Sequence, residues 1–568
     1  MKKEILCMEI ITHHILSMYV FLNLKQAGDN MSPFFRKRTK KKKQESIPTI
    51  PDSEMIKSNQ DKFISANLEE NMSKINAIFQ NDMDFSNRRF KLFGTIPASL
   101  ICLKSLVSNE IIDRDIIKPL QELSLPKGSD NVGTDFILEQ VLYYSDTKII
   151  ENYSKLLQSL TLGKTIVFIE GISKALEFDA VQIDKRSIEQ PETERVVIGP
   201  RDGFIEQIIT NIGLIRYRLP VPEFRIEQTE VGTRSHTKVA ICYLDDIANP
   251  TLVQEVKNRI DAVEIDSILD AGYLEQFIQD NPWSPFPQVL NTERPDKTIA
   301  NILEGRVAIL VDGSPFALIV PATFHQFYQT NEDYNVRWLI SSFIRIIRFI
   351  ALVFSLTFSS FYVTALSFHP ELIPASFVVA ASSGRQGVPF PVFVEVLIME
   401  IAMEILREAS VRMPQQIGGA LSIVGVLVVG QAAVQAGFVS PITVFIIALS
   451  TIGSFATPSY NAANAFRMLR FCLVILAGIF GLLGLAIGII IVLNHMVSLR
   501  SYGVPYMAPI APVNLKALKD AIIRAPLDWL KERPKTLNPQ NTKRVGKRVK
   551  EKAENNFVEE GRGGEDET

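Results

Sequence analysis

The chain has 568 residues, enough for two or three domains, and its 60 basic and 62 acidic side chains nearly cancel. This balance excludes a strongly basic protein, and we expect no nucleic-acid partner. The distribution of charge is more informative: polar sequence extends to about Asn335, apolar runs dominate to about Leu499, and a charged tail follows. The pattern predicts a large soluble part followed by a membrane part.

The first 58 residues form a predicted N-terminal extension and basic arm, which we expect to be disordered. Two lysines and an apolar stretch resemble a weak signal sequence, but Glu4 and Glu9 interrupt it and no small-residue cleavage site follows. We expect a start-site extension, with initiation at Met31. The basic run from Arg36 to Lys43 is typical of solvated segments, and it argues against export and for contact with anionic lipid on the cytoplasmic side.

The following region shows a soluble α/β pattern, which we divide into two cytoplasmic subdomains, residues 59–185 and 186–335. Helical spacing of apolar residues predicts helices within residues 61–79, 252–263 and 274–280. Alternating or continuous apolar runs predict strands at 165–171, 238–245 and 306–321. The last run contains a hairpin turn at Asp312-Gly313-Ser314.

The Gly-Lys-Thr sequence within residues 162–168 imitates the end of a phosphate-binding loop. Such a loop needs a glycine where Gln158 stands and a helix afterwards, whereas a strand is predicted here. We therefore reject nucleotide binding. Asp202 and Asp312 each precede a glycine, and we assign both to turns because Asp-Gly is a strong turn signal.

Cysteine and histidine patterns indicate no metal site and no cofactor. The four cysteines are far apart and form no CxxC pair, which argues against a zinc site and against a disulfide framework. The six histidines are scattered as well.

Residues 336–500 are predicted to form a transmembrane helical domain, and residues 501–568 a charged C-terminal tail. The last apolar segment, residues 471–493, has no charge and is long enough to span a bilayer. Residues 372–384 are too short to span alone and are a candidate re-entrant segment. The five candidate spans are residues 339–368, 388–406, 417–437, 442–456 and 471–493.

Arginines set the expected orientation, because basic loops stay in the cytoplasm. Arg337 places the soluble part inside, and Arg467 and Arg470 place the start of the fifth segment inside. This count leaves the chain outside after the fifth segment, whereas the basic tail favours the cytoplasm. We favour a cytoplasmic tail, which requires a re-entrant segment or a further crossing after Tyr502.

The second segment carries four carboxylates in an apolar run: Glu395, Glu400, Glu404 and Glu408. On a helix, residues four apart lie about 40° apart around the axis, so the last three share one stripe and the first is offset by about 140°. Because a charge that faces lipid costs several kcal/mol, we expect the stripe to face protein, water or the membrane interface.

Three interpretations of these carboxylates remain open. The helix lies along the membrane interface with its carboxylates in water. Alternatively, the carboxylates form ion pairs with Arg385, Arg407 or Arg412. In the third interpretation, identical subunits around an axis turn one carboxylate per chain into a ring that selects cations.

Small and polar residues of the later segments favour close helix packing. The glycines include a GxxxG motif, and the two glutamines lie four apart and share a face, so we expect them to bond between helices. The candidates are Gly478, Gly481, Gly484, Gly488, Gln431 and Gln435.

Five ordered blocks spread over residues 60–525 carry a family signal. They are GPRDGFIEQIITNIGLIRYRL (199–219), EGRVAILVDGSPFALIVPATF (304–324), FPVFVEVLIMEIAMEILREA (390–409), RMPQQIGGALSIVGVLVVGQAAVQAGFVSP (412–441) and IGSFATPSYNAANAFRMLRF (452–471). Together they resemble the A subunit of the GerA family of spore germination receptors.

The resemblance implies a receptor in the inner spore membrane that senses small nutrients and starts germination. It implies two partners, a transporter-like B subunit that binds the nutrient and a lipoprotein C subunit. It also implies a homo-oligomeric, nutrient-gated cation channel, which favours the pore interpretation of the carboxylates. The family supplies no agreed catalytic residues.

Two other classes of function compete with this one. Secondary transporters often contain internal repeats and broken helices, and the membrane segments show no clear repeat. A membrane-anchored enzyme needs a nucleophile–base pair, a metal cluster or a phosphate loop, none of which the sequence indicates. We expect a receptor subunit that is not an enzyme, with a transporter of a small solute or ion as the alternative.

Overall fold

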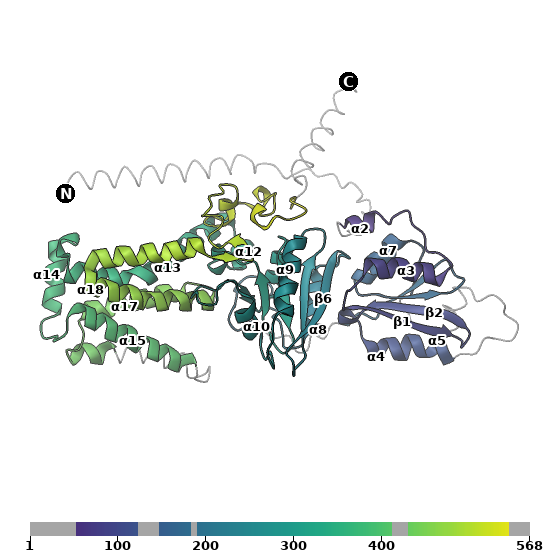
Figure 1. The fold of residues 1–568 in the computed structure, drawn as a ribbon, viewed down its shortest axis with the longest axis horizontal. Helices are drawn as coiled ribbons and strands as arrows, with labels where there is room; N and C mark the ends of the chain where they lie inside the picture. The colour runs from purple at the N-terminus through teal and green to yellow at the C-terminus, as the bar shows by residue number, and fades with distance from the viewer. Residues whose placement is uncertain (1–52, 123–146, 183–189, 412–429, 545–568) are drawn as a thin grey trace, which may run out of the picture. The chain divides into compact units, whose positions relative to one another are not determined.

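The soluble part contains two five-stranded antiparallel sheets with the same strand order. The computed structural model describes residues 53–122, 147–182, 190–411 and 430–544. The first sheet has the order β1-β2-β4-β5-β3, and the second has the order β6-β7-β9-β10-β8 (Figure 1). The first comprises β1 Phe85–Leu92, β2 Ile96–Leu103, β3 Lys148–Ile150, β4 Thr165–Ile169 and β5 Ala175–Phe178. The second comprises β6 Phe224–Val231, β7 Thr237–Leu244, β8 Leu290–Thr292, β9 Val307–Val311 and β10 Ala317–Val320.

The two sheets belong to structural repeats of each other. Corresponding strands have equal lengths, and β4 and β9 begin at Thr165 and Val307, 142 positions apart. Helices correspond as well: α3 Leu68–Ile78 matches α8 Ile208–Arg218, and α7 Tyr153–Thr161 matches α11 Pro295–Ile302. Between its second and third strands the second repeat contains α9 Pro250–Asp261 and α10 Ala271–Ile278. The described part of the same connection in the first repeat contains α4 Asn109–Ile111, the π-helix Ile112–Ile117 and α5 Lys118–Glu122. The predicted α/β class is confirmed, and we propose that residues 59–185 and 186–335 each contain one repeat.

Each repeat uses the turn between its last two strands to cap its first helix. Glu170 accepts a hydrogen bond from the backbone N–H of Leu68 at 2.9 Å. Asp312 accepts the corresponding bond from the N–H of Ile208 at 3.2 Å. A carboxylate at a helix N-terminus satisfies an unpaired donor and complements the helix dipole, so Asp312 stabilises the start of α8.

The glycine of the Gly-Lys-Thr sequence has a structural role. Gly163 lies between α7 and β4 with φ +88°, and Gly305 lies between α11 and β9 with φ +99°. Both values lie in the left-handed region that favours glycine. The same turn occurs in both repeats, and a strand follows each, as predicted for the first.

A buried ion-pair network joins the two repeats. Arg216 of α8 donates from Nε to Oδ2 of Asp84 at 2.7 Å and also pairs with Asp82. The Oγ of Ser105 donates to the same carboxylate of Asp84 at 2.7 Å. Because Arg216, Asp82 and Asp84 are all buried, the charges are compensated where water cannot solvate them.

The C-terminal part is a helical bundle. Within the described ranges, α13 and α18 are the helices long and apolar enough to cross a membrane, judged by length and composition. Much of the third predicted segment lies outside the described residues. The main helices are α13 Trp338–Ser367, α14 Ala375–Gly384, α15 Val392–Val411, α17 Pro441–Phe455 and α18 Tyr460–Ser498.

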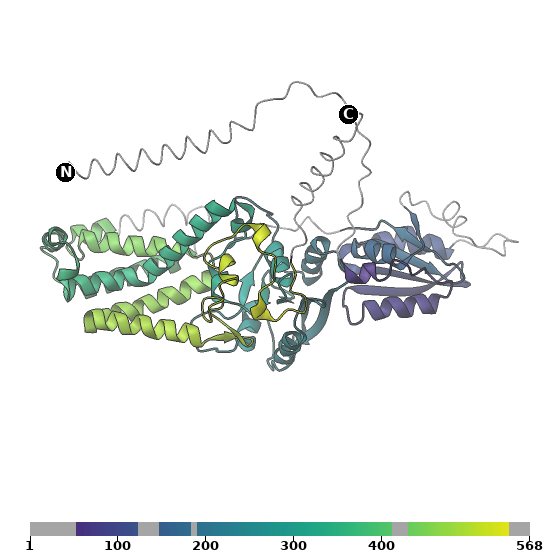
Figure 2. The same cartoon turned by 90° about the horizontal axis from the view of Figure 1, so that it is seen from above.

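α18 is a hairpin of two helical arms, residues 460–480 and 482–498, which reverses at Gly481 (Figure 2). Gly481 has φ 60° and ψ −137°, a conformation essentially restricted to glycine. A Cβ atom on Gly484 would lie 2.1 Å from the carbonyl oxygen of Leu476, although eight residues of straight helix extend about 12 Å. The fifth predicted segment is therefore not one straight span, because its glycines let the chain reverse.

Both ends of α18 contact the second repeat. The N–H of Ser459 donates to the carbonyl of Phe327 at 3.3 Å. At the other end, His495 Nε2 lies 2.9 Å from Ser284 Oγ. The chain after α18 therefore returns to the end of the bundle at which α13 begins.

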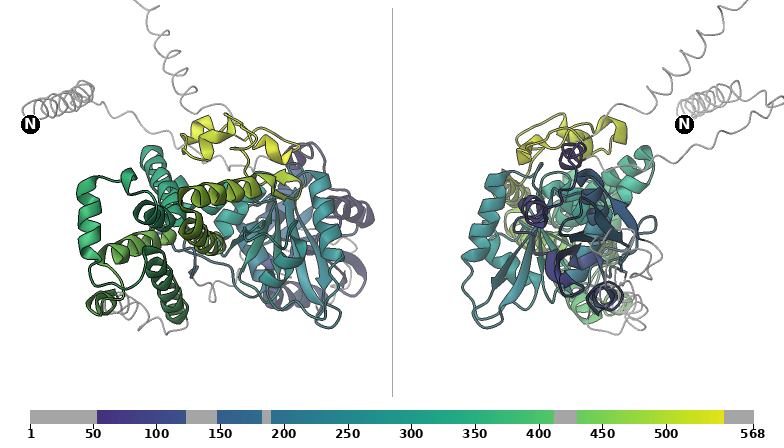
Figure 3. Two further views of the ribbon diagram at one scale, coloured as in Figure 1. Left: turned by 60° about the vertical axis from the view of Figure 1, so that its left-hand side comes forward. Right: turned by 90° about the vertical axis from the view of Figure 1, so that its right-hand side faces the viewer.

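Residues 500–544 fold against the second repeat, as the yellow segment in Figure 3 shows. Ser501 Oγ donates to the carbonyl of Gln288 at 2.7 Å, and the N–H of Phe324 donates to the carbonyl of Tyr506 at 2.8 Å. At the other end of the described chain, the short helix α2 Glu54–Lys57 is ordered within the predicted extension. Ser53 caps α2 and donates from Oγ to Glu223 at 2.6 Å, so residues 53–57 belong to the folded unit.

Asp333, in α12 Glu332–Asn335, ties the start of α13 to the soluble part. It accepts a hydrogen bond from Arg345 Nε at 2.9 Å and pairs with Arg348 at 3.2 Å. Arg345 also pairs at 3.1 Å with Asp520, which lies in residues 500–544, hereafter the C-terminal segment. Burial alone would raise the pKa of Asp333, but the bonds and charges of Arg348 and Arg345 outweigh it and hold this pKa below the ordinary 3.8.

Replacing Asp333 with asparagine is expected to lower the free energy of unfolding by about 1.5–3 kcal/mol, the contribution of a hydrogen bond to a charged group. A lowered folded-state pKa stabilises above the unfolded pKa, so the advantage of wild type is present at neutral pH and is lost as pH falls through the folded pKa. Thermal unfolding of the detergent-purified protein between pH 7 and the acid limit, roughly pH 3, measures both effects. Exposed Asp528 supplies the control, Asp528→Asn. A difference that does not change with pH, or that the control reproduces, would contradict the prediction.

Candidate functional site

Four helices bring a charged pair into the interior of the bundle. Glu400 of α15 and Arg470 of the first arm of α18 form an ion pair, with 2.7 Å between Oε2 and Nη2. Ser359 of α13 donates from Oγ to Oε1 of Glu400 at 2.8 Å, and the same Oγ lies 3.0 Å from Oγ of Ser450 of α17. All four residues are at most 1% exposed. We refer to Glu400, Arg470, Ser359 and Ser450 as the central cluster.

Small residues let the helices of the central cluster approach each other. Ser355 and Ser359 lie four apart and share one face of α13. A Cβ atom on Gly453 of α17 would lie 2.9 Å from the carbonyl oxygen of Ala351, so only glycine permits this contact. Arg470 Nη1 lies 3.5 Å from the carbonyl oxygen of Ser355, which adds a polar neighbour to the guanidinium.

Glu395 occupies a second buried polar site at the start of α15. Arg385 Nε donates to its Oε1 at 2.9 Å. The N–H of Ser440 and the Oγ1 of Thr443, both at the start of α17, donate to its Oε2 at 3.0 Å each. Glu395 is 0% exposed and lies at a helix N-terminus, where unpaired N–H groups favour an anion.

The other two carboxylates of α15 lie toward its surface. Glu404 pairs with Arg407 at 2.8 Å, and its side chain is 44% exposed. Glu408 is exposed as well, and Ile401 and Ile405 are exposed beside these two carboxylates. Because α15 is helical, Glu400, Glu404 and Glu408 share one stripe, but Glu400 is buried while Glu404 and Glu408 lie toward the surface.

The sequence interpretation named Arg385 and Arg407 as possible partners, and both contact carboxylates of α15. Arg412 lies outside the described residues. Sequence reasoning missed Arg470, Ser359 and Ser450. Arg470 was counted only as a cytoplasmic loop charge, although an arginine within an apolar helix itself indicates a buried partner.

The four candidate glycines pack within this chain. A Cβ atom on Gly478 would lie 2.2 Å from the ring of Phe393 of α15, and one on Gly481 would lie 2.9 Å from Phe368. Gly484 and Gly488 pack within the α18 hairpin, where a Cβ atom on Gly488 would lie 2.4 Å from Leu473. Gln431 and Gln435 are exposed on the single chain. Their expected contacts with other helices remain a prediction.

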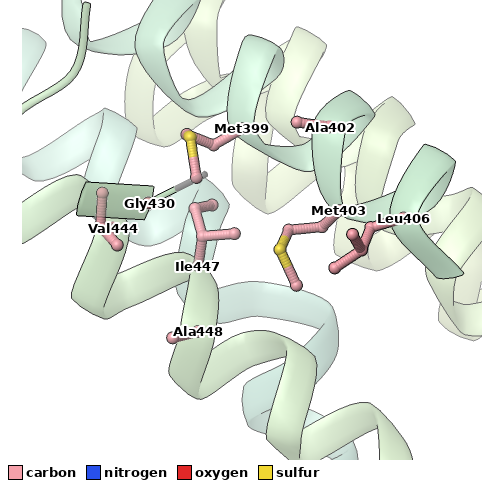
Figure 4. A pocket seen from close by; sticks show the side chains of 8 residues that line it. All are labelled: Met399, Ala402, Met403, Leu406, Gly430, Val444, Ile447 and Ala448. Atoms are coloured by element: carbon pink, nitrogen blue, oxygen red, sulfur yellow. The ribbon is translucent and has the colours of Figure 1, made fainter. Parts of the chain in front are cut away.

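A small pocket opens between α15 and α17 (Figure 4). It has a volume of about 30 Å³, far below the roughly 300 Å³ at which ligand sites begin. Its lining is apolar, so it offers no side chain that would orient an amino acid or a sugar. No group of three potential metal ligands occurs in the described part of the chain. The lining residues are Met399, Ala402, Met403, Leu406, Gly430, Val444, Ile447 and Ala448.

Comparisons with known proteins place the chain in a family. The family model described as "Bacillus/Clostridium GerA spore germination protein" matches residues 73–536. The chain is 41% identical over 487 residues to spore germination protein KA of Bacillus subtilis (strain 168), covering 85% of this chain and 89% of that protein. It is 37% identical over 504 residues to the uncharacterized membrane protein YfkQ of the same organism, covering 89% and 98%. The crystal structure of the N-terminal domain of the A subunit of the Bacillus megaterium spore germinant receptor GerK3 is 31% identical, with 46% of this chain and 97% of that chain covered and a TM-score of 0.37.

Proposed function

The chain belongs to the GerA family of spore germination proteins, and from this premise we propose that it is the A subunit of a nutrient-sensing germination receptor in the inner spore membrane. Its proposed partners are a transporter-like B subunit, a lipoprotein C subunit and further copies of this chain. The relation to protein KA over 85% of the chain supports this assignment.

The proposed membrane arrangement places the soluble part and residues 500–544 in the cytoplasm. The 30 residues of α13 extend about 45 Å, more than the roughly 30 Å of a hydrocarbon core. Each arm of α18 has the length of a short crossing, and the hairpin brings the chain back to its starting side. Basic residues at the end of the bundle near the soluble part, including Arg345, Arg348 and Arg467, favour a cytoplasmic position for that end.

The proposed activity is the release of cations through an oligomer of this chain. Glu404 and Glu408 are the carboxylates suited to the conducting path, because they lie at the surface of α15 rather than inside the bundle. In lipid they would be costly, whereas around an oligomer axis they would attract cations. Glu395 and Glu400 are buried and engaged by partners of the same chain, so they are assigned to holding the bundle together.

The proposed gating is a shift between two arrangements of the receptor. The pocket between α15 and α17, about 30 Å³, is too small for an amino acid or a sugar, and nutrient binding is assigned to the partner subunit on the family resemblance. Nutrient can open the channel only to the extent that it binds the open arrangement more tightly.

The Glu404→Gln, Glu408→Gln double variant tests this assignment in spores, with receptor levels matched by immunoblot. Nutrient-triggered release of potassium and calcium is expected to slow several-fold, because the carboxylates that concentrate cations are gone. Glu264, exposed in the soluble part, supplies the control Glu264→Gln. Unchanged release would move the conducting path to another surface, and solute uptake without ion release would favour a transporter.

A further inference from the structure

All three tryptophans of the chain lie at the end of the bundle that contacts the soluble part. Trp338 is the first residue of α13 and is 40% exposed. Trp283 precedes Ser284, which contacts His495 in the last turn of α18, and is 94% exposed. Trp529 lies in the C-terminal segment and is 58% exposed. Exposed tryptophans are typical of the boundary between membrane and water.

The C-terminal segment reaches this level through bonds to α13. Ser342 Oγ donates to the carbonyl of Arg524 at 3.0 Å, and Arg345 pairs with Asp520. The uninterrupted apolar run of α13 begins at Phe349, so these contacts lie about 10 Å and 6 Å outside it along the helix axis. The headgroup layer on each side of a bilayer is about 5–8 Å thick. When α13 spans the membrane, the Arg345 contact thus lies within the headgroup layer and the Ser342 contact just beyond it, so the segment lies at the boundary between headgroups and water.

Residues 513–529 combine exposed apolar side chains with positive charge. Lys516 and Lys519 are exposed, and Lys519 Nζ lies 5.9 Å from the centre of the Trp529 ring. Asp528 is an exposed acidic residue of the segment, whereas Asp520 is engaged by Arg345. The large exposed apolar residues are Val513 at 71%, Leu515 at 76%, Ile523 at 48% and Leu527 at 53%.

We propose that residues 513–529, with Trp283, form an interfacial belt that binds the anionic leaflet of the membrane. The apolar side chains and tryptophan rings enter the boundary between headgroups and acyl chains, and Lys516 and Lys519 attract anionic headgroups. A lysine near an anionic surface is attracted to it, so two lysines give a measurable preference for anionic over neutral vesicles. The proposal rests on the membrane placement of α13 and is independent of the cation path.

Lipid fits this surface better than a neighbouring subunit does. The segment is bonded to α13 through Ser342 and Arg345, just outside its apolar run, where a flat bilayer would meet it. Paired lysines beside apolar side chains complement an acidic surface that presents hydrocarbon just beneath it. The belt would hold the soluble repeats at a fixed height above the membrane, since the second repeat already packs on both arms of α18.

Depth-dependent quenching of Trp529 tests the belt on the full-length protein. Trp283→Phe and Trp338→Phe leave Trp529 as the only tryptophan. The protein is reconstituted in phosphatidylcholine vesicles with or without phosphatidylglycerol, using lipids brominated near the headgroup or near the chain end. Quenching is expected to be stronger by the shallow bromines, and stronger when phosphatidylglycerol is present.

The Lys516→Glu, Lys519→Glu double variant is expected to lose the dependence on phosphatidylglycerol. Lys238→Glu, an exposed change in β7, is expected to retain it. Absence of quenching in protein that elutes as wild type would show that protein covers the segment, and equal quenching in neutral vesicles would remove the role of the lysines; either result overturns the proposal. Quenching that persists while the Glu404→Gln, Glu408→Gln variant releases cations at the wild-type rate would overturn the channel assignment and leave the belt standing.

Discussion

Replacing Arg470 with methionine is expected to lower strongly the yield and thermal midpoint of the folded protein. Glu400 is 1% exposed and would be left as an uncompensated carboxylate inside the bundle. Removing one partner of a buried ion pair costs about 3–5 kcal/mol. A typical protein has a total stability of about 5–15 kcal/mol, so this loss is a large share of it. The yield of detergent-extracted monodisperse protein and its thermal midpoint measure the effect.

A double variant separates the missing charge from missing volume. Glu400→Met combined with Arg470→Met exchanges the pair for apolar side chains, a change that is often neutral or stabilising by about 1–4 kcal/mol. We therefore expect the double variant to recover the yield that Arg470→Met loses. Arg500→Met, at an exposed arginine, is expected to resemble wild type. A double variant as depleted as the single one would show that the geometry of the pair, rather than its charge balance, is required.

The recovered double variant also separates structure from conduction. If the central cluster only holds the four helices together, spores with the double variant should release cations at the wild-type rate. The proposed path runs along Glu404 and Glu408 at the surface of α15, so this is the result we expect. A double variant that folds well but releases no cations would indicate that the ion path runs through the central cluster.

Local patterns in the sequence predicted most elements of the fold. The strands β4, β7, β9 and β10 and the helices α9 and α10 lie where apolar periodicity placed them, because that periodicity reflects burial of one face. The duplication of the α/β unit was not predicted. Its clearest trace, TIVFIEG at 165–171 against VAILVDG at 307–313, preserves burial and the turn glycine rather than residue identity.

The central cluster could not be predicted from the sequence, for a different reason. Glu400 and Arg470 are 70 positions apart, and their contact depends on how four helices pack. Composition showed that Glu400 required a partner, but the nearby arginines were equally plausible candidates. The reversal at Gly481 was also missed, because an uncharged apolar run that can span a membrane looks the same whether it is straight or folded. The reversal accounts for the conflict in the sequence between the basic loops, which place the end of the fifth segment outside, and the basic tail, which favours the cytoplasm.

Replacing Gly484 with alanine is expected to open the α18 hairpin. The added Cβ would lie 2.1 Å from the backbone oxygen of Leu476 and 2.9 Å from Cβ of Phe480. A backbone atom cannot rotate away as a side chain can, so relief requires separation of the arms. We expect a loss of about 3 kcal/mol or more, at the upper end for overpacked sites. Gly384→Ala is the matched control, because a Cβ there would meet nothing within 4 Å.

A disulfide between the two arms of α18 tests directly whether they form a hairpin. In a background without the four native cysteines, Leu473→Cys and Gly488→Cys place two thiols where Leu473 now contacts Gly488. In one straight helix the same positions would be about 22 Å apart and could not be joined within a chain. Mild oxidation should therefore protect both thiols from a maleimide that adds visible mass, and Gly484→Ala should reduce that protection while Gly384→Ala preserves it. Unprotected thiols in the otherwise unchanged protein would mean that α18 crosses the membrane once. Residues 500–544 would then lie on the side opposite the soluble repeats, and the contacts of Tyr506 and Ser501 with the second repeat could not form.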